Sequence, residues 1–576
     1  TQTFEYLYNC EDAEIDFART ILSDGTLMHL SDNALEVGAT FARQPDYNNL
    51  RKVRFSLKEV KEGSVIDFRY HIDRKPSQIF YPLFIREYLQ STEPILQKKV
   101  IVFAPNDIEL SISQNNFGDN ITYIKEIDDN QTIYCFEVIN SPRFETESNM
   151  PPFADVLPNV TIAAKQSLVK EDESNPNAKE ILKNIGWEEI GREFSKILSR
   201  NLVNDEFLKS EIESVVEGKT TSLKKASALY RFVTQQITNL DIVPSQSSYY
   251  VHRPSHILTR RQGNSLDKAF LLYAMLKLAG FDVQYLLCAE RSSGSFLRES
   301  PCISLLTSPL LLLKIESDIF YLAPFSNNTQ FGYIPPNLQG AAALLISEQT
   351  PEIVEIPVLQ ASKEIIKSNT TVTLNEDGSI KAKCVQSAKG QKACGMRELG
   401  NLKPIELKQH FEKEISQIDP NATLVSYKTS DLKDLNIPVV IEYEYEISDY
   451  ALKAGKKLMA FRLPDLYYSA SSINKWERNL PLFWSNNSMQ SNTITLVIPE
   501  NYKVRYLPES IQSYTGGVPY SYYRADFKYN SNTIVFNDEY VRESVYESPS
   551  SYKTLLDTIK TAARMSNQWI ILEAVK

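Results

Sequence analysis

The 576-residue sequence has only 5 histidines, no long apolar run and no block of basic residues. Because no run of about 18 apolar residues occurs, no segment is predicted to cross a membrane as a helix. The net charge of −10 and the even spread of the 62 lysines and arginines argue against nucleic acid and anionic membranes as partners. The small number of histidines also limits where a general base can lie.

Cysteine is also sparse, and none of the six forms a C-x-x-C pair. This spacing excludes a zinc ribbon and a thioredoxin motif, and it leaves a disulfide or two possible beside plain buried thiols, which we favour. Cys288 and Cys302 are conceivable displaced nucleophiles, but neither has a histidine or a helix start nearby in sequence. We expect these two to be buried thiols or a mutual disulfide. The six cysteines are Cys10, Cys135, Cys288, Cys302, Cys384 and Cys394.

Composition places the chain among multidomain globular proteins. With 42% hydrophobic and 23% charged residues, it can fill the cores of three or four domains. The chain begins at Thr1, which suggests that a signal segment was removed upstream. The 31 tyrosines and the Asn- and Ser-rich loops fit an exported bacterial protein. We therefore expect an extracytoplasmic protein, periplasmic or on the outer surface of a bacterium.

Residues 1–160 show the two-residue period of β-strands. The segment "RKVRFSLKEVKEGSVIDFRYHI" alternates apolar and polar residues, with Glu62-Gly63 as the turn between two strands. No helical period occurs here, so we predict an antiparallel β-sandwich. The Pro-rich "ETESNMPPFADVLPN" marks its end.

Residues 161–350 change to a helical period. Apolar residues predict helices over 207–215 and 223–237. The segment that follows Ser265 is apolar nearly all round and stops at Gly280, which predicts a helix buried on every side. A strand "FDVQYLLCA" and a hairpin "PLLLLKIESDIFYLAPF" follow.

Residues 351–576 return to β-strands, and the whole fold is predicted to be multidomain α+β. The segment "NTTVTLNEDGSIKAKCV" predicts a hairpin across Asp377-Gly378, and "NTITLVIPENYKVRYLPES" a further pair of strands. A helix over 552–563 precedes a last strand, "WIILEAV".

The order of these segments resembles a known family. A β region, then "RPSHILTRRQGNSLDKAFLLYAMLKLAGFDVQYLL" and "FYLAPF", then a β-rich tail containing "WERNLPLFW", resembles the bacterial transglutaminase-like superfamily. The resemblance implies a papain-like α+β core between two β domains of unknown function. It also implies a Cys at the start of the buried helix, a His on a following strand and an Asp on the next strand, as in cysteine proteases and transglutaminases.

At the three triad positions this sequence has Ser265, Leu310 and Ala323. No histidine lies between residues 257 and 409, so a shift of the alignment recovers no base. A serine without a base is a poor nucleophile, and we expect Ser265 to cap the helix instead. Asp267 and Lys268 survive from the motif and are expected to shape the helix start.

His252 and His256 lie upstream, with Pro254 between them. The proline argues against a helix that aligns them on a metal, so we interpret them as loop histidines and predict no metal and no cofactor. A role for His256 as a base for Ser265 is the less favoured alternative. The residues expected around a candidate cleft are Gly263, Asn264, Ser265, Asp267, Tyr249, Tyr250, His252, His256 and Tyr333.

The sequence therefore favours a catalytically inactive transglutaminase-like protein that binds or scaffolds an unknown protein, peptide or glycan. Two alternatives stay open. One is a papain-like cysteine protease or transglutaminase, as the resemblance alone implies. The other is a hydrolase that uses Ser265 with a base from elsewhere, for example His410.

Overall fold

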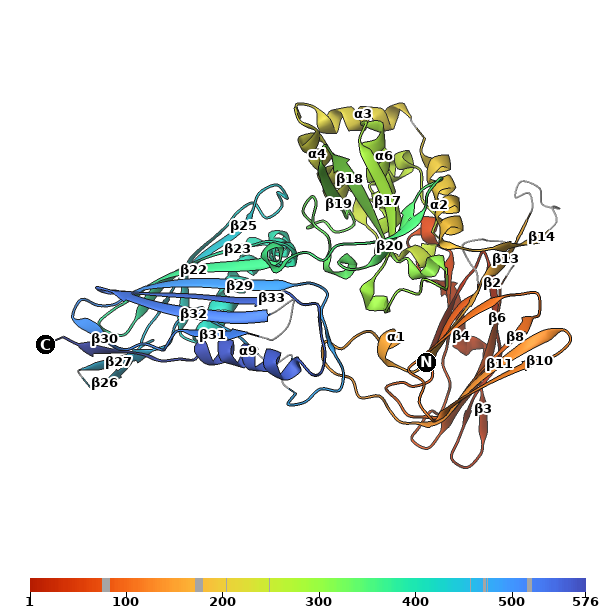
Figure 1. The fold of residues 1–576 in the computed structure, drawn as a ribbon, viewed down its shortest axis with the longest axis horizontal. Coiled ribbons are helices and arrows are strands. Elements are labelled where there is room, and N and C mark those ends of the chain that lie inside the picture. The colour runs from red at the N-terminus through yellow and green to blue at the C-terminus, as the bar shows by residue number, and fades with distance from the viewer. Residues whose placement is uncertain are drawn as a thin grey trace.

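The computed structural model describes residues 1–74, 83–170, 180–203, 205–247, 249–455, 457–469, 473, 475–514 and 521–575. Figure 1 shows the chain in three groups of elements, with the N-terminal strands at one end, the central helices and sheet between, and the C-terminal sheets at the other end. The multidomain α+β class predicted from the sequence is confirmed. No helix among the described residues is both long and apolar enough to span a membrane.

The N-terminal strands form three-stranded antiparallel sheets. In sheet order these are β1 (Gln2–Leu7), β5 (Leu50–Phe55) and β4 (Leu35–Ala39); β3 (Leu27–His29), β2 (Glu11–Ile21) and β6 (Val65–Arg74); β10 (Ile121–Ile127), β11 (Gln131–Ser141) and β8 (Ile95–Pro105); and β7 (Phe84–Tyr88), β12 (Asn159–Ala164) and β9 (Leu110–Asn115).

The predicted turn at Glu62-Gly63 is present between two strands, but these strands do not form a hairpin with each other. The strands on either side of it enter different sheets: β5 pairs with β1 and β4, whereas β6 pairs with β2. Eight or more residues separate the two strands, too many for a tight hairpin, so each strand pairs with a partner elsewhere in the sequence.

The central region places five helices around one five-stranded sheet (Figure 1). The helices are α2 (Trp187–Asn201), α3 (Glu206–Val216), α4 (Ser222–Gln236), α5 (Pro254–Arg260) and α6 (Ser265–Leu278). The sheet order is β19 (Asp318–Leu322), β18 (Ser308–Ile315), β17 (Asp282–Ala289), β20 (Ala342–Ile346) and β21 (Glu352–Glu355). The predicted helices and the β18–β19 hairpin are confirmed.

Helix α6 is the centre of the largest apolar core, as its unbroken apolar sequence predicts. Ten of its residues are buried, and it packs against β17 and β18 on one side and α4 on the other. Along β18 the side chains alternate: Leu311 and Leu313 join the core that contains α6, whereas Leu310 belongs to a smaller cluster. The sheet therefore separates two apolar layers.

The C-terminal region contains an eight-stranded sheet and a four-stranded sheet. The first has the order β24 (Ala422–Thr429), β25 (Val439–Ile447), β23 (Ile380–Ala388), β22 (Ile365–Leu374), β29 (Ser488–Val497), β33 (Thr533–Arg542), β32 (Ser521–Asn530) and β31 (Ile511–Tyr514). The second has the order β26 (Leu452–Ala454), β27 (Leu458–Phe461), β35 (Ile570–Ala574) and β30 (Tyr502–Tyr506). Helices α8 (Pro404–Ile418) and α9 (Tyr552–Met565) pack on the edges of the larger sheet.

Two expectations for this region have opposite outcomes. The hairpin across Asp377-Gly378 is confirmed, and Gly378 has the positive φ of +89° that its turn requires. The pairing expected within 492–510 is wrong, because β29 pairs with β22 and β33, whereas β30 pairs with β35.

Candidate functional site

Three residues shape the turn that leads into α6. Arg261 adopts a left-handed conformation with φ +53° and ends α5. Gly263 comes so close to the next turn that a Cβ there would lie 2.7 Å from the Cβ of Asp267. The Oδ1 of Asn264 then accepts a hydrogen bond from the backbone N–H of Asp267 at 3.0 Å. Asn264 is therefore the N-cap, and the prediction that Ser265 caps the helix is wrong by one residue.

Asp267 is buried and fully engaged by the protein itself. It accepts a hydrogen bond from the hydroxyl of Tyr47, which arrives from the N-terminal region on the short helix η2 (Pro45–Tyr47). It also accepts one from the backbone N–H of His252 at 2.8 Å, and the Nδ1 of His252 lies 3.0 Å from its Oδ2. Burial and the charge of Asp267 hold the pKa of Tyr47 well above its usual range. This carboxylate thus joins three segments.

Lys268 is buried beside it and has a similar structural role. Its Nζ donates to the carbonyl oxygens of Thr234 at 3.0 Å and Ile237 at 2.6 Å, at the end of α4. Burial lowers the pKa of Lys268 to about 7. Both residues that survive from the family motif therefore hold the helix start in place, as expected.

The three positions at which the resemblance implies a triad hold Ser265, Leu310 and Ala323. Ser265 is half-buried as the first residue of α6, and its hydroxyl makes no hydrogen bond to any residue that the structure describes. Leu310 and Ala323 are fully buried and lie together in the smaller apolar cluster, with Cys288. The helix that begins at Ser265 packs with the other layer. The structure therefore brings Leu310 and Ala323 together, but it does not place them in the core of α6.

The two upstream histidines are closer to each other than their sequence suggests. Pro254 does not prevent a helix, because it is the first residue of α5, where its missing N–H costs nothing. His256 lies on that helix and His252 just before it, and their rings stack with centroids 5.1 Å apart. The Nε2 of His256 lies 3.3 Å from the Oδ2 of Asp46, in η2. No sequence pattern connects Asp46 with these histidines, because 206 residues or more separate them.

The tyrosines expected in the cleft have different roles. Tyr249 is buried and donates its hydroxyl hydrogen to the carbonyl oxygen of Ile303 at 2.7 Å. Tyr333 is also buried, and its hydroxyl donates to Glu364 at 2.7 Å. Only Tyr250 is exposed, at 53%. Most of the residues expected around a cleft are therefore internal supports.

No disulfide joins any of the six cysteines, all of which lie in the described part of the chain. Burial raises the pKa of Cys288 and of Cys302, which favours the protonated thiols at neutral pH. Of the two expectations for this pair, the structure favours buried thiols over a mutual disulfide.

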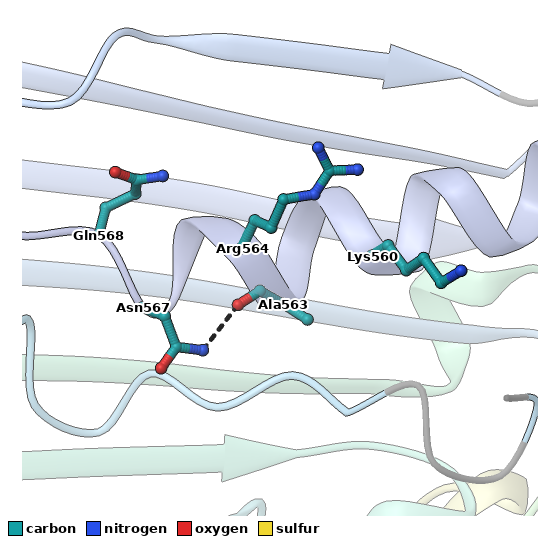
Figure 2. Close-up of a pocket in the computed structure, with 5 residues that line it drawn as sticks. All are labelled: Lys560, Ala563, Arg564, Asn567 and Gln568. Carbon is teal, nitrogen blue, oxygen red and sulfur yellow. Dashed lines mark hydrogen bonds between the residues drawn. The ribbon is translucent and has the colours of Figure 1, made fainter.

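Two cavities lie outside the motif region. A cavity of about 540 Å³ forms where the loop 330–333 meets the C-terminal sheet, and Lys363, Lys367 and Lys389 stand around it. A second, of about 790 Å³, lies under the larger C-terminal sheet and contains Asp465. Figure 2 shows a third site, open at the surface, where Asn567 donates to the carbonyl oxygen of Ala563 at 2.8 Å. That bond belongs to the C-terminal end of α9 and offers no catalytic group.

Asp465 is an acid–base candidate that the sequence did not reveal. It accepts hydrogen bonds from the hydroxyls of Tyr445 at 2.8 Å and Tyr443 at 3.2 Å. Burial raises its pKa to about 6 despite these donors. Its backbone has φ +58°, which is uncommon for a residue other than glycine. A single aspartate after Pro464 has no sequence feature that would have indicated this environment.

Comparison with known proteins identifies two parts of the chain. Residues 2–145 match the family model of DUF3857, a domain of unknown function with a solved structure. Residues 210–301 match the core model of the transglutaminase-like superfamily. No curated protein matches the sequence.

A solved structure shares the fold of this chain at low sequence identity. A crystal structure of a candidate protease from Parabacteroides distasonis is 15% identical and superposes with a TM-score of 0.64, covering 99% of this chain and 91% of that one. A candidate cysteine protease from Cytophaga hutchinsonii is 12% identical over 42% of this chain and 79% of that one, with a TM-score of 0.18. The first of these shows that the whole arrangement of elements recurs in another protein.

Proposed function

We propose that the transglutaminase-like core of this chain, which follows a DUF3857 domain, no longer catalyses a reaction and that the protein binds or scaffolds a peptide, protein or glycan. The observation that carries the proposal is the environment of Ser265. Its hydroxyl has no base among the described residues, and the positions expected to supply His and Asp hold Leu310 and Ala323. A serine hydroxyl in this state does not become an alkoxide at neutral pH.

The residues around Ser265 support the same conclusion. In an active site, polar groups at the helix start would be left for the substrate. Here Asn264 caps the helix and Asp267 accepts from Tyr47 and His252. The polar groups of the motif therefore stabilise the junction with the N-terminal region.

We place the binding site at the cavity of about 540 Å³ beside the C-terminal sheet. Lys363, Lys367 and Lys389 stand at its rim, and no carboxylate lines it among the residues that the structure describes. None of the three lysines forms an ion pair with a described residue, and Phe331 adds an aromatic surface. This chemistry suits a ligand that carries carboxylate groups, such as an acidic peptide or an acidic glycan.

The division of the chain near residues 160 and 350, and a location outside the cytoplasm, belong to the same proposal. Limited proteolysis tests the boundaries, and fractionation of the native host tests the location.

The catalytic part is tested by amine incorporation and peptide hydrolysis with the wild type, Ser265→Cys and Ser265→Ala. We expect no turnover by any of the three. The new thiol of Ser265→Cys would lie at a helix start, which lowers its pKa, but no His would take its proton. Turnover by the wild type that disappears in Ser265→Ala would overturn the proposal.

The binding part is tested by titration with an acidic and a neutral peptide of equal length, and with an acidic and a neutral oligosaccharide. We expect only the acidic ligands to bind. The double variant Lys367→Gln and Lys389→Gln should lower their affinity about tenfold or more. Lys381→Gln, on the exposed face of β23, is the matched control. Equal binding of neutral ligands would contradict the proposed site.

One observation favours a second candidate, a hydrolase that uses Ser265. The Nδ1 of His252 lies 3.0 Å from the buried carboxylate of Asp267, and a histidine with a carboxylate at this nitrogen forms two of the three members of a catalytic triad. Labelling of Ser265 by a fluorophosphonate that is lost in His252→Gln would establish this activity. We expect no labelling, because no hydrogen bond joins His252 to Ser265 in the described chain.

A further inference from the structure

Three side chains that bind metals in other proteins converge where the N-terminal region meets α5. Asp46, His252 and His256 each offer one ligand atom, and these atoms all lie within 4.8 Å of one another. Asp46 comes from η2, whereas the two histidines belong to the central region. Two imidazoles and a carboxylate form a donor set that Zn²⁺ prefers.

The distances are close to those of a tetrahedral site. Zinc binds imidazole nitrogen and carboxylate oxygen at about 2.0–2.2 Å, which places neighbouring ligand atoms about 3.3–3.5 Å apart. The Nε2 of His256 and the Oδ2 of Asp46 already lie 3.3 Å apart. A side-chain movement of about 1 Å would bring the third ligand atom to the spacing of a tetrahedral site.

A second carboxylate orients His252 for this role. The Nδ1 of His252 lies 3.0 and 3.2 Å from the two oxygens of Asp267, so an N–H at Nδ1 donates to Asp267 and leaves the lone pair of Nε2 free. Asp267 is itself fully buried and held by Tyr47. Histidines that bind metals are commonly fixed by a carboxylate in this way.

The site already accommodates a positive charge. The guanidinium of Arg260 lies 3.2 Å from the same Oδ2 of Asp46, so a metal ion would displace this arginine. The side chains of His252, Asp46 and His256 are 12%, 23% and 41% exposed, which leaves a path from solvent and room for a water as fourth ligand. We propose that Asp46, His252 and His256 bind Zn²⁺, and that the ion fastens the N-terminal region to the central one. This inference goes beyond the proposed function and contradicts the sequence-based expectation of no metal.

The test titrates Zn²⁺ into metal-free full-length protein and follows heat of binding and thermal unfolding. We expect one ion per chain and a rise in melting temperature with Zn²⁺. His256→Asn and Asp46→Asn should weaken binding about tenfold to a hundredfold and abolish the rise. Arg260→Gln should bind more tightly, because the competing cation is removed. His410→Asn, on α8, is the matched control and should bind like the wild type.

Folding and zinc binding are measured separately, so each outcome either supports the zinc site or overturns it. A melt without metal shows whether a variant still folds, and His256→Asn is the safer variant because its side chain is 41% exposed. Absence of binding at micromolar Zn²⁺, equal binding by wild type and His256→Asn, or weaker binding by Arg260→Gln would each overturn the proposal. None of these readouts depends on catalysis or on the acidic ligand. The proposed function can therefore fail while the zinc site is confirmed, and the reverse also holds.

Discussion

Asp267 at the start of α6 is fully buried, whereas Asp465 lines a cavity under the C-terminal sheet and is partly buried. Asp267 accepts hydrogen bonds from Tyr47 and His252 and links the N-terminal region to the core. Asp465 lines a cavity of about 790 Å³, and burial raises its pKa to about 6. The carboxylate at the start of α6 thus has a structural role, whereas the carboxyl with the raised pKa lines a cavity in a region that no catalytic motif indicates.

The first prediction tests the structural half of this comparison and has the largest expected effect. Asp267→Ala should lower the free energy of unfolding by about 3–5 kcal/mol, because it leaves the hydroxyl of Tyr47 and the N–H of His252 buried without an acceptor. Urea denaturation measures the change, with Asp282→Asn at the exposed start of β17 as control. A loss below about 1 kcal/mol would show that Asp267 is not a structural link.

The second prediction tests the other half through pH. Because the pKa of Asp465 is raised from 3.8 to about 6, the folded chain holds more protons than the unfolded chain between those values. The free energy of unfolding therefore falls as pH rises through this window, by up to about 3 kcal/mol for this group. Asp465→Asn keeps the acceptor for Tyr445, tolerates φ +58° and does not titrate.

The variant should therefore match the wild type near pH 4 and become the more stable protein above pH 6. Urea denaturation of the variant and the wild type at pH 4, 5, 6 and 7 measures the difference. A constant difference across the four pH values would mean that Asp465 titrates normally.

Local patterns in the sequence predicted the elements, but not how distant ones meet. Helix α6 and the β18–β19 hairpin were predicted correctly because periodicity and turn residues are short-range signals. The turn at Glu62-Gly63 did not indicate the partners of β5 and β6, because both strands pair with strands that precede them in the chain.

The candidate site was predicted in part for the same reason. The helix start at Ser265 was predicted because it follows a recognisable local motif. The approach of Asp46 to α5 and of Tyr47 to α6 was not, because about 200 residues separate them from their partners. The burial of Asp465 likewise depends on the C-terminal strands that pack around it.

The last prediction concerns the smallest effect and separates two adjacent residues at the helix start. Asn264 has extended dihedral angles and its Oδ1 accepts from the N–H of Asp267, whereas Ser265 is already helical and its hydroxyl bonds to no described residue. Asn264→Ala should therefore cost about 1–2 kcal/mol of unfolding free energy, and Ser265→Ala less than about 0.5 kcal/mol. Thermal and urea denaturation of the two variants beside the wild type measure both values. If Ser265→Ala cost as much as Asn264→Ala, the hydroxyl of Ser265 would also stabilise the start of the helix. If it cost almost nothing, the hydroxyl of Ser265 would contribute nothing measurable to stability, and Asn264, Asp267 and Lys268 would hold the helix start in place.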